Sequence, residues 1–226
     1  MQVPSPTYCR PEAFELFAES VERLDSNYGL LMAAVAISMH ELPDVDVAGV
    51  DSALQNITDT VRERAPSGSE PALLAHAHAV LFDELGFGGD DHVFGDPGSS
   101  YLPLVLRRRR GLPIALSMIY KVVLDRLGIV VEGINAPGHF LVSVREHGKQ
   151  ILVDPFHRGR VLSRAEALER VSVATGRCPQ PGDHLLVPAT HRDWIRRVLR
   201  NLHSLFLQRR QRDRLGAMLE LARLLD

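Results

Sequence analysis

The sequence predicts an α+β protein with a helical N-terminal layer, a small core of one helix packed on an antiparallel sheet, and a C-terminal helical hairpin. Apolar residues recur at steps of three and four in the N-terminal half and again near the C-terminal end, as in amphipathic helices. Between these regions, three short segments between residues 129 and 156 have strand character. We therefore expect three parts, over residues 1–98, 99–185 and 186–226.

Four helices are expected before residue 86. Pro11 suits the first turn of a helix, where its missing N–H needs no partner. The first apolar stripe consists of Phe14, Phe17, Val21 and Leu24. LLMAAVAISMHEL, from Leu30, is apolar nearly all round and should lie at the centre of the layer. Val47, Val50, Leu54, Ile57 and Val61 form the next stripe, PALLAHAHAVLFDEL gives the fourth helix, and the loop GFGGDDHVFGDPGSS ends the layer.

Two further helices precede the strands. YLPLVLRRRR predicts a short helix that ends near Gly111, and Pro113 suits the start of the next helix, which should end at Gly128. Its apolar positions are Ile114, Leu116, Ile119, Val123 and Leu127. The strand segments that follow are IVVEGINA, HFLVSVRE and KQILVDPF.

The last two strands flank His147-Gly148, a suitable two-residue hairpin turn in which glycine adopts a positive φ without strain. Counting outward from this turn places Leu141 opposite Asp154. His139 lies two residues from Leu141 and so on the same face of the sheet, diagonal to Asp154. We therefore expect the His139 imidazole and the Asp154 carboxylate to come close together.

The C-terminal part begins after a further helix, for which Ser163 and Glu166 have the spacing of a capping box. Thr190 is expected to cap a long helix. This helix carries Trp194, Val198, Leu202 and Leu205, and the final helix carries Leu215, Met218, Leu219, Ala222 and Leu225. These two helices form the predicted hairpin.

Composition narrows the classes of function. The formal net charge of −2 gives the chain no overall attraction to nucleic acid or to an anionic membrane. Because a signal peptide and a run of roughly 18 uncharged residues are both missing, we expect a cytoplasmic protein without membrane contact. Cys9 and Cys178 are then expected as free thiols.

Metal and cofactor sites are not expected. His76 and His78 would point to different faces of a helix, and a second group, His139, Asp154 and His157, matches no recognised ligand set. These histidines are interpreted as surface residues or as hydrogen-bonded core residues.

GLPIALSMIYKVVLDRLGIVVEGINAPGHFLVSV and ILVDPF resemble the core of the transglutaminase-like superfamily, and specifically its bacterial SirB-type branch. In that branch, a helical region precedes the papain/transglutaminase-like core and tetratricopeptide-like helices follow it. The tail LRNLHSLFLQRRQRDRLGAMLELARLLD is similar to one such repeat. A single repeat cannot bury both of its faces, so the tail should pack on the core or on a partner.

Active members of this superfamily use a Cys-His-Asp triad, and the resemblance places His139 and Asp154 at its second and third positions. Gly111-Leu112-Pro113 stands where the family has Gly-x-Cys. Proline has no atom that can attack an acyl carbon, so cysteine chemistry is not expected. The resemblance then implies a pseudoenzyme that acts as an interaction or regulatory module with an unknown protein partner.

Two other functions stay open. Ser117 lies one helical turn beyond Pro113, where it would serve as the nucleophile of a hydrolase or acyl transferase with His139 and Asp154. The alternative is that the Ser117 hydroxyl bonds a carbonyl of its own helix or the imidazole of His139. Likewise, His139 and Asp154 form either an acid–base pair or a structural, ligand-holding bridge.

The third function is nucleic-acid binding through the basic run Arg107, Arg108, Arg109 and Arg110. The competing interpretation is a helix C-terminus whose positive charge complements the helix dipole and pairs with acidic residues of the preceding loop. Those acidic residues are Asp90, Asp91 and Asp96. A second basic run at 208–214 would strengthen the nucleic-acid interpretation if both runs share one face. Asn135, in the first strand segment, is a further candidate binding residue.

Overall fold

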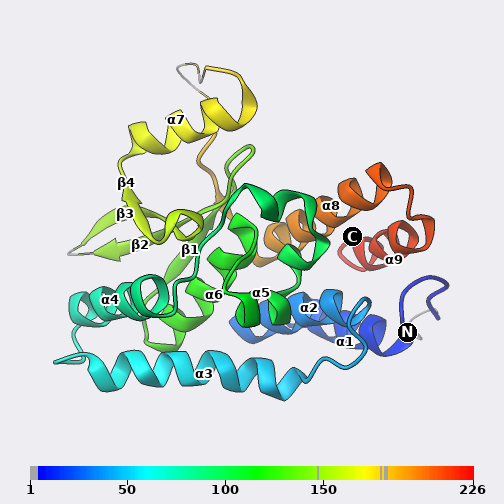
Figure 1. Cartoon of the computed structure of the whole chain (residues 1–226), viewed down its shortest axis with the longest axis horizontal. Coiled ribbons are helices and arrows are strands. Elements are labelled where there is room, and N and C mark those ends of the chain that lie inside the picture. The colour runs from blue at the N-terminus through cyan, green and yellow to red at the C-terminus, as the bar shows by residue number, and fades with distance from the viewer. Residues whose placement is uncertain (1–4, 147, 179, 181–182) are drawn as a thin grey trace.

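The computed structural model describes residues 5–146, 148–178, 180 and 183–226, and it confirms the α+β architecture (Figure 1). The N-terminal layer is built from α1 (Pro11–Glu22), α2 (Asn27–Met39), α3 (Val47–Arg64) and α4 (Glu70–His78). In Figure 1 this layer lies along the bottom of the molecule, the sheet rises above it, and the C-terminal helices occupy the right-hand side.

The helix α2 lies at the centre of the helical layer, as its all-round apolar sequence predicted. Residues 29–38 are all buried. The helix α2 packs against α1, α5 (Leu102–Arg108), α6 (Pro113–Arg126) and α8 (His191–Gln208). Ser26 begins the helix by accepting a hydrogen bond from the Gly29 N–H, 2.9 Å away. A helix that is buried on every side cannot show a polar face, which explains its composition.

The fourth predicted helix departs from regular α geometry. After His78 the chain continues as a π-helical segment, η1 (Ala79–Glu84), and only then turns into the loop. His78 Nε2 lies 2.7 Å from the Tyr120 hydroxyl, and Phe82 stacks on the same tyrosine ring. The wider π turn thus occurs where the His78 and Phe82 side chains both contact Tyr120 of α6.

The helix α6 (Pro113–Arg126) joins the helical layer to the sheet. Its first twelve residues, 113–124, are all buried, and it contacts α2, α3, α4 and α5 as well as β1 and β2. Lys121 is the one buried lysine in this run. Its ammonium lies 2.8 Å from Asp125 Oδ2 and donates to the Val131 carbonyl, so the charge is compensated inside the core.

The sheet has the order β4-β3-β2-β1-β5, and every pair is antiparallel. Its strands are β1 (Val131–Ile134), β2 (Leu141–Glu146), β3 (Lys149–Asp154), β4 (Arg160–Leu162) and β5 (Pro188–Ala189). The hairpin register is the predicted one, with Val142 opposite Val153. Of the turn, His147 lies outside the described residues and Gly148 has a φ of 76°. The short strands β4 and β5 carry too little pattern to be predicted.

Helices cover both faces of the sheet. Phe140, Val142 and Val144 point into the main core with α6 and α8, whereas Leu141 joins a smaller apolar cluster with Ala167 of α7 (Arg164–Thr175). Side chains alternate along a strand, so Asp154, opposite Leu141, also faces α7. The predicted capping box of Ser163 and Glu166 begins α7.

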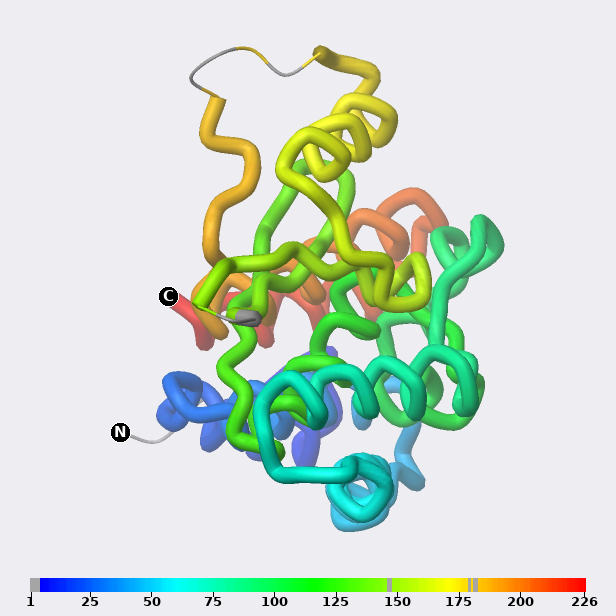
Figure 2. The backbone as a smooth tube through the Cα atoms, turned by 90° about the vertical axis from the view of Figure 1, so that its left-hand side faces the viewer, coloured from blue at the N-terminus to red at the C-terminus, as the bar shows by residue number. Residues whose placement is uncertain are grey.

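The C-terminal hairpin packs on the core, which is one of the two arrangements expected for it; the other was packing on a partner. It consists of α8 (His191–Gln208), which Thr190 caps, and α9 (Arg212–Arg223). Figure 2 shows these red and orange helices above the blue N-terminal ones, and α8 packs against α2 while α9 packs against α1. Trp194 fits against Gly133, where an added Cβ would come within 1.9 Å of the indole nitrogen.

The Glu220 carboxylate of α9 holds the N-terminal segment by accepting hydrogen bonds from the backbone N–H groups of Thr7, Tyr8 and Cys9. Cys9 is 4% exposed and therefore belongs to the core, and burial raises the pKa of its thiol to about 12. Both Cys9 and Cys178 are free thiols, as predicted. Among the described residues, no helix has the length and apolar character needed to span a membrane.

Candidate functional site

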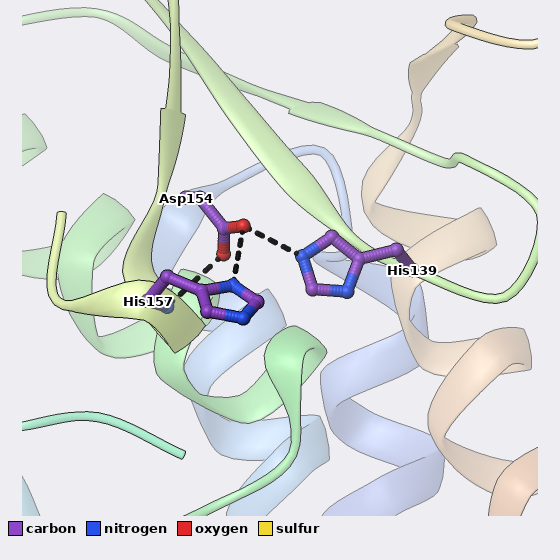
Figure 3. A group of neighbouring side chains, drawn as sticks. All are labelled: His139, Asp154 and His157. Carbon is purple, nitrogen blue, oxygen red and sulfur yellow. Dashed lines mark hydrogen bonds and ion pairs between the residues drawn. The ribbon is translucent and has the colours of Figure 1, made fainter. Parts of the chain in front are cut away.

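The central pair of the candidate site lies where β2 begins and β3 ends. His139 Nε2 is 3.0 Å from Asp154 Oδ2 (Figure 3). The Asp154 side chain is fully buried and His139 is 8% exposed. The hairpin register brings the two residues together, and their contact confirms the geometry predicted from the turn.

Asp154 accepts hydrogen bonds on both carboxylate oxygens. Its Oδ1 takes the backbone N–H groups of Phe156 (3.1 Å) and His157 (3.2 Å), because Asp154 caps the short 3-10 helix η4 (Pro155–His157). Its Oδ2 lies 2.8 Å from His157 Nδ1, which Figure 3 shows beside the His139 contact, and 3.3 Å from Arg170 Nε. Asp154 is thus the hub of a network that joins the hairpin to α7.

His157 and Arg170 are members of this network that the sequence did not predict. His157 follows Asp154 at three residues, and the Asp-Pro turn offers a local signal for that contact. Arg170 comes from α7, and its approach depends on how α7 packs against the sheet, which no local pattern specifies.

The Asp154 carboxyl group is ionised at neutral pH. Burial by itself opposes ionisation, but the hydrogen bonds from His139 and His157 outweigh it and hold the pKa of Asp154 well below its usual range. An ionised carboxylate can only accept hydrogen bonds, so His139 donates its Nε2–H to Asp154, and the tautomer with this hydrogen has its lone pair on Nδ1. The Nδ1 atom makes no hydrogen bond to any described residue. The pair therefore has the geometry of a carboxylate-oriented base.

Pro113 and His139 line the same cavity, which has a volume of about 300 Å³. Pro113 is the first residue of α6, at the helix start where the resemblance places the nucleophile. Ser117 is fully buried and does not line this cavity. Its hydroxyl has no hydrogen-bond partner in the described part of the chain, so neither the expected carbonyl bond nor a bond to His139 forms.

His139, Asp154 and His157, which match no recognised ligand set in the sequence, nevertheless place their ligand atoms within 4.8 Å of one another. The Arg170 guanidinium lies in the same group, 3.3 Å from Asp154 Oδ2 and 3.1 Å from His157 Nδ1. Its fixed positive charge repels a divalent cation at that position. These atoms are arranged as a hydrogen-bonded ion network more than as a set of metal ligands.

The basic run lies beside the acidic loop, as one of its two interpretations expected. Arg108 pairs with Asp96 at 2.7 Å, and Arg110 lies 3.9 Å from Asp90. Arg109 ends α5 (Leu102–Arg108) in the left-handed conformation, with a φ of 57°. Its guanidinium donates to the Leu85 carbonyl and that of Arg110 to the Gly86 carbonyl, whereas Arg107 lines a separate apolar groove.

Two arginines of the second basic run, at 208–214, also bind other parts of the protein. Arg209 donates to the Gly95 carbonyl, and Arg214 pairs with Glu41 at 2.9 Å. Asn135, the remaining candidate, uses its side-chain oxygen to accept a hydrogen bond from Arg197 Nη1 at 2.6 Å. Arg197 lines the cavity beside His139, and no local sequence pattern predicts its presence there.

A helix whose first residue lines a cavity together with a histidine, itself hydrogen-bonded to an aspartate at the end of an antiparallel strand, is the arrangement that the resemblance to transglutaminase-like proteins implies. Residues 48–200 match the transglutaminase-like superfamily, and the chain belongs to that superfamily.

Bacterial relatives cover most of the chain. A UPF0162 protein of Xylella fastidiosa (strain 9a5c) is 36% identical over 195 residues, which are 84% of this chain and 69% of the relative. A UPF0162 protein of Pseudomonas aeruginosa is 32% identical over 179 residues, which are 78% of this chain and 64% of the relative. The chain thus spans about two thirds of the length of these relatives.

A shorter match is found to F-box only protein 21 of Mus musculus, which is 33% identical over 95 residues, 38% of this chain and 15% of that protein. No solved structure matches the chain.

Proposed function

We propose that this protein is a non-catalytic, cytoplasmic member of the superfamily that acts as an interaction or regulatory module and uses the cavity beside His139 to hold a ligand or a segment of a partner protein. The observation that carries the proposal is Pro113, which lies in the wall of that cavity where an active member would present a thiol. A proline ring offers no proton and no lone pair for attack on an acyl carbon.

The finer assignment to the SirB-type branch belongs to the same proposal. The order of helical layer, core and α8–α9 hairpin supports it, with the hairpin in the place of one tetratricopeptide-like repeat. Ser117 does not rescue acyl chemistry, because its hydroxyl is buried away from the cavity. The His139–Asp154 pair then serves to orient Nδ1 toward a bound group.

The proposal is tested by restoring the nucleophile. In a Cys178→Ser background, Pro113→Cys places a thiol at the N-terminus of α6, where the helix dipole and His139 lower its pKa. Cys9 is buried with a pKa of about 12 and does not interfere. We expect alkylation by iodoacetamide at pH 7 to be about tenfold faster than for a free thiol, since the thiolate fraction rises from a few per cent to a majority.

The matched control is Pro113→Cys combined with His139→Ala, in which this acceleration should disappear while circular dichroism shows the same fold. The protein with its natural Pro113 should hydrolyse neither acyl esters nor amides. Turnover by that protein that His139→Ala abolishes would overturn the proposal and favour an acyl hydrolase with another nucleophile. Equal alkylation rates in the single and double variants would show that positions 113 and 139 do not work as a pair.

A further inference from the structure

Arg197 is a half-buried cation without a counter-charge. Its Nη1 donates to Asn135 Oδ1 at 2.6 Å and to the Ala136 carbonyl at 3.2 Å, and both acceptors are neutral. No described carboxylate pairs with it, and its Nε and Nη2 make no hydrogen bond within the described part of the chain. Burial, and then the charge of Arg200, lower the pKa of Arg197, so its environment penalises the positive charge.

Three other partly or fully buried cations in this protein are paired with carboxylates, whereas the half-buried Arg192 donates to the Leu225 carbonyl. Lys121 pairs with Asp125 at 2.8 Å, Arg126 pairs with Asp51, and Arg170 lies 3.3 Å from Asp154 Oδ2. A buried charge without such a partner is costly. The charge of Arg197 would therefore be compensated if an anionic group of another molecule bound beside it.

The cavity that Arg197 lines offers further unused polar groups. Ser100 is 7% exposed, and its hydroxyl makes no hydrogen bond to a described residue. His139 Nδ1 is likewise unpartnered, and Asn201 adds an amide from the helix that carries Arg197. Asp96 also lines the cavity, but its carboxylate already pairs with Arg108 at 2.7 Å. The donors that line this space of about 300 Å³ are thus the Arg197 guanidinium, the Ser100 hydroxyl and the Asn201 amide.

The apolar part of the cavity lining is supplied by residues of the main hydrophobic core. Leu112 and Phe140 belong to the main core and also line the cavity. A site with convergent polar groups beside apolar walls, at this volume, suits a small molecule or one or two residues of a peptide.

We infer that this cavity binds a carboxylate group, which pairs with the free edge of the Arg197 guanidinium and accepts the Ser100 hydroxyl. The inference rests on the proposed function of the cavity as a holding site, and it names the chemistry of what is held. A guanidinium edge matches the two oxygens of a carboxylate. A free small acid and the C-terminal carboxylate of a peptide share this chemistry.

The test measures binding of N-acetyl-alanine and of acetyl-Ala-Ala-Ala, each as the free acid and as the C-terminal amide. The single tryptophan, Trp194, reports binding by fluorescence, because its ring lies 4.7 Å from that of Phe140 in the cavity wall. We expect each acid to bind at least tenfold more tightly than its amide, as a charge-assisted hydrogen bond requires. Tighter binding of the tripeptide acid would identify a peptide terminus, and equal binding a small acid.

Arg197→Gln should reduce affinity for the acids at least tenfold and leave the amides unchanged, whereas Arg196→Gln, an exposed neighbour on α8, should change neither. Arg197→Lys keeps the charge without the two-pronged edge and should give an intermediate loss. If Arg197→Gln does not fold, the acid–amide comparison on the unaltered protein still decides.

The inference would be overturned by equal affinity for acid and amide. It would also be overturned if neither acid bound at about 10 mM, a concentration of the order at which small ligands occupy weak sites. The alkylation experiment on Pro113→Cys has a separate readout. The carboxylate-binding inference can therefore be refuted while the proposed non-catalytic function stands. The proposed function can equally be refuted while carboxylate binding is observed.

Discussion

Replacing Asp154 by asparagine tests whether the carboxylate is the hub that ties the hairpin to α7. Asp154→Asn keeps Oδ1, which accepts the backbone N–H groups of η4. It replaces Oδ2 by an amide NH2 group that faces His139, His157 and Arg170. The two imidazoles can present a lone pair instead of a proton, but a guanidinium cannot accept a hydrogen bond. Arg170 would then lose its counter-charge.

The expected loss follows from the charge that is removed. Each charge-assisted hydrogen bond contributes about 1.5–3 kcal/mol. Desolvation of the buried carboxylate offsets part of this gain, and removal of one partner of a buried ion pair costs about 3–5 kcal/mol in net terms. Because domains unfold with free energies of about 5–15 kcal/mol, Asp154→Asn should remove a large fraction of the stability.

Urea unfolding at pH 7, followed by circular dichroism, measures this loss. The matched control is Asp59→Asn, which removes an exposed carboxylate paired with Arg62 at 2.8 Å and should cost less than about 1 kcal/mol. If the two variants lose the same small amount, the network around Asp154 contributes nothing beyond a surface ion pair and the reasoning is refuted.

Two further predictions concern the same core. The folded-state pKa of Asp154 is depressed, so below about pH 4 the unfolded chain binds a proton at Asp154 that the folded chain does not bind. The unaltered protein should therefore lose stability in this range relative to Asp154→Asn. If urea unfolding shows the same stability difference between the two proteins from pH 5 to pH 3, this prediction is contradicted. Ser117→Ala removes a buried hydroxyl without a partner and should leave thermal stability unchanged or raise it by up to about 1 kcal/mol. Ser38→Ala, whose buried hydroxyl donates to the Ala34 carbonyl at 3.0 Å, should instead lose about 1 kcal/mol, and equal losses would count against the difference.

Helix starts and the hairpin were predictable because their determinants are local. Ser163 and Thr190 cap helices through residues three positions away. The two-residue turn sets the register of β2 and β3, and that register brings His139 to Asp154. The π-helical segment after His78 was not predictable, because its side chains meet a tyrosine 42 residues later in the chain.

Only part of the candidate site could therefore be predicted from the sequence. Sequence spacing gave the histidine–aspartate pair and the proline at the helix start, since these depend on one turn and one helix N-terminus. It placed Ser117 on the face of Pro113 by helical periodicity, but that periodicity cannot say which side of a fully buried helix lines a cavity. The structure puts Ser117 outside the cavity that Pro113 lines.

By itself, the sequence determined the α+β class, the pairing of His139 with Asp154 and the absence of a thiol at position 113. Only the tertiary structure decided what surrounds that pair. Arg170 reaches Asp154 because α7 covers one face of the sheet, and Arg197 lines the cavity because α8 packs across the other. Contacts between segments so far apart in the chain arise from the packing of whole elements, and short-range patterns of residues carry no record of that packing.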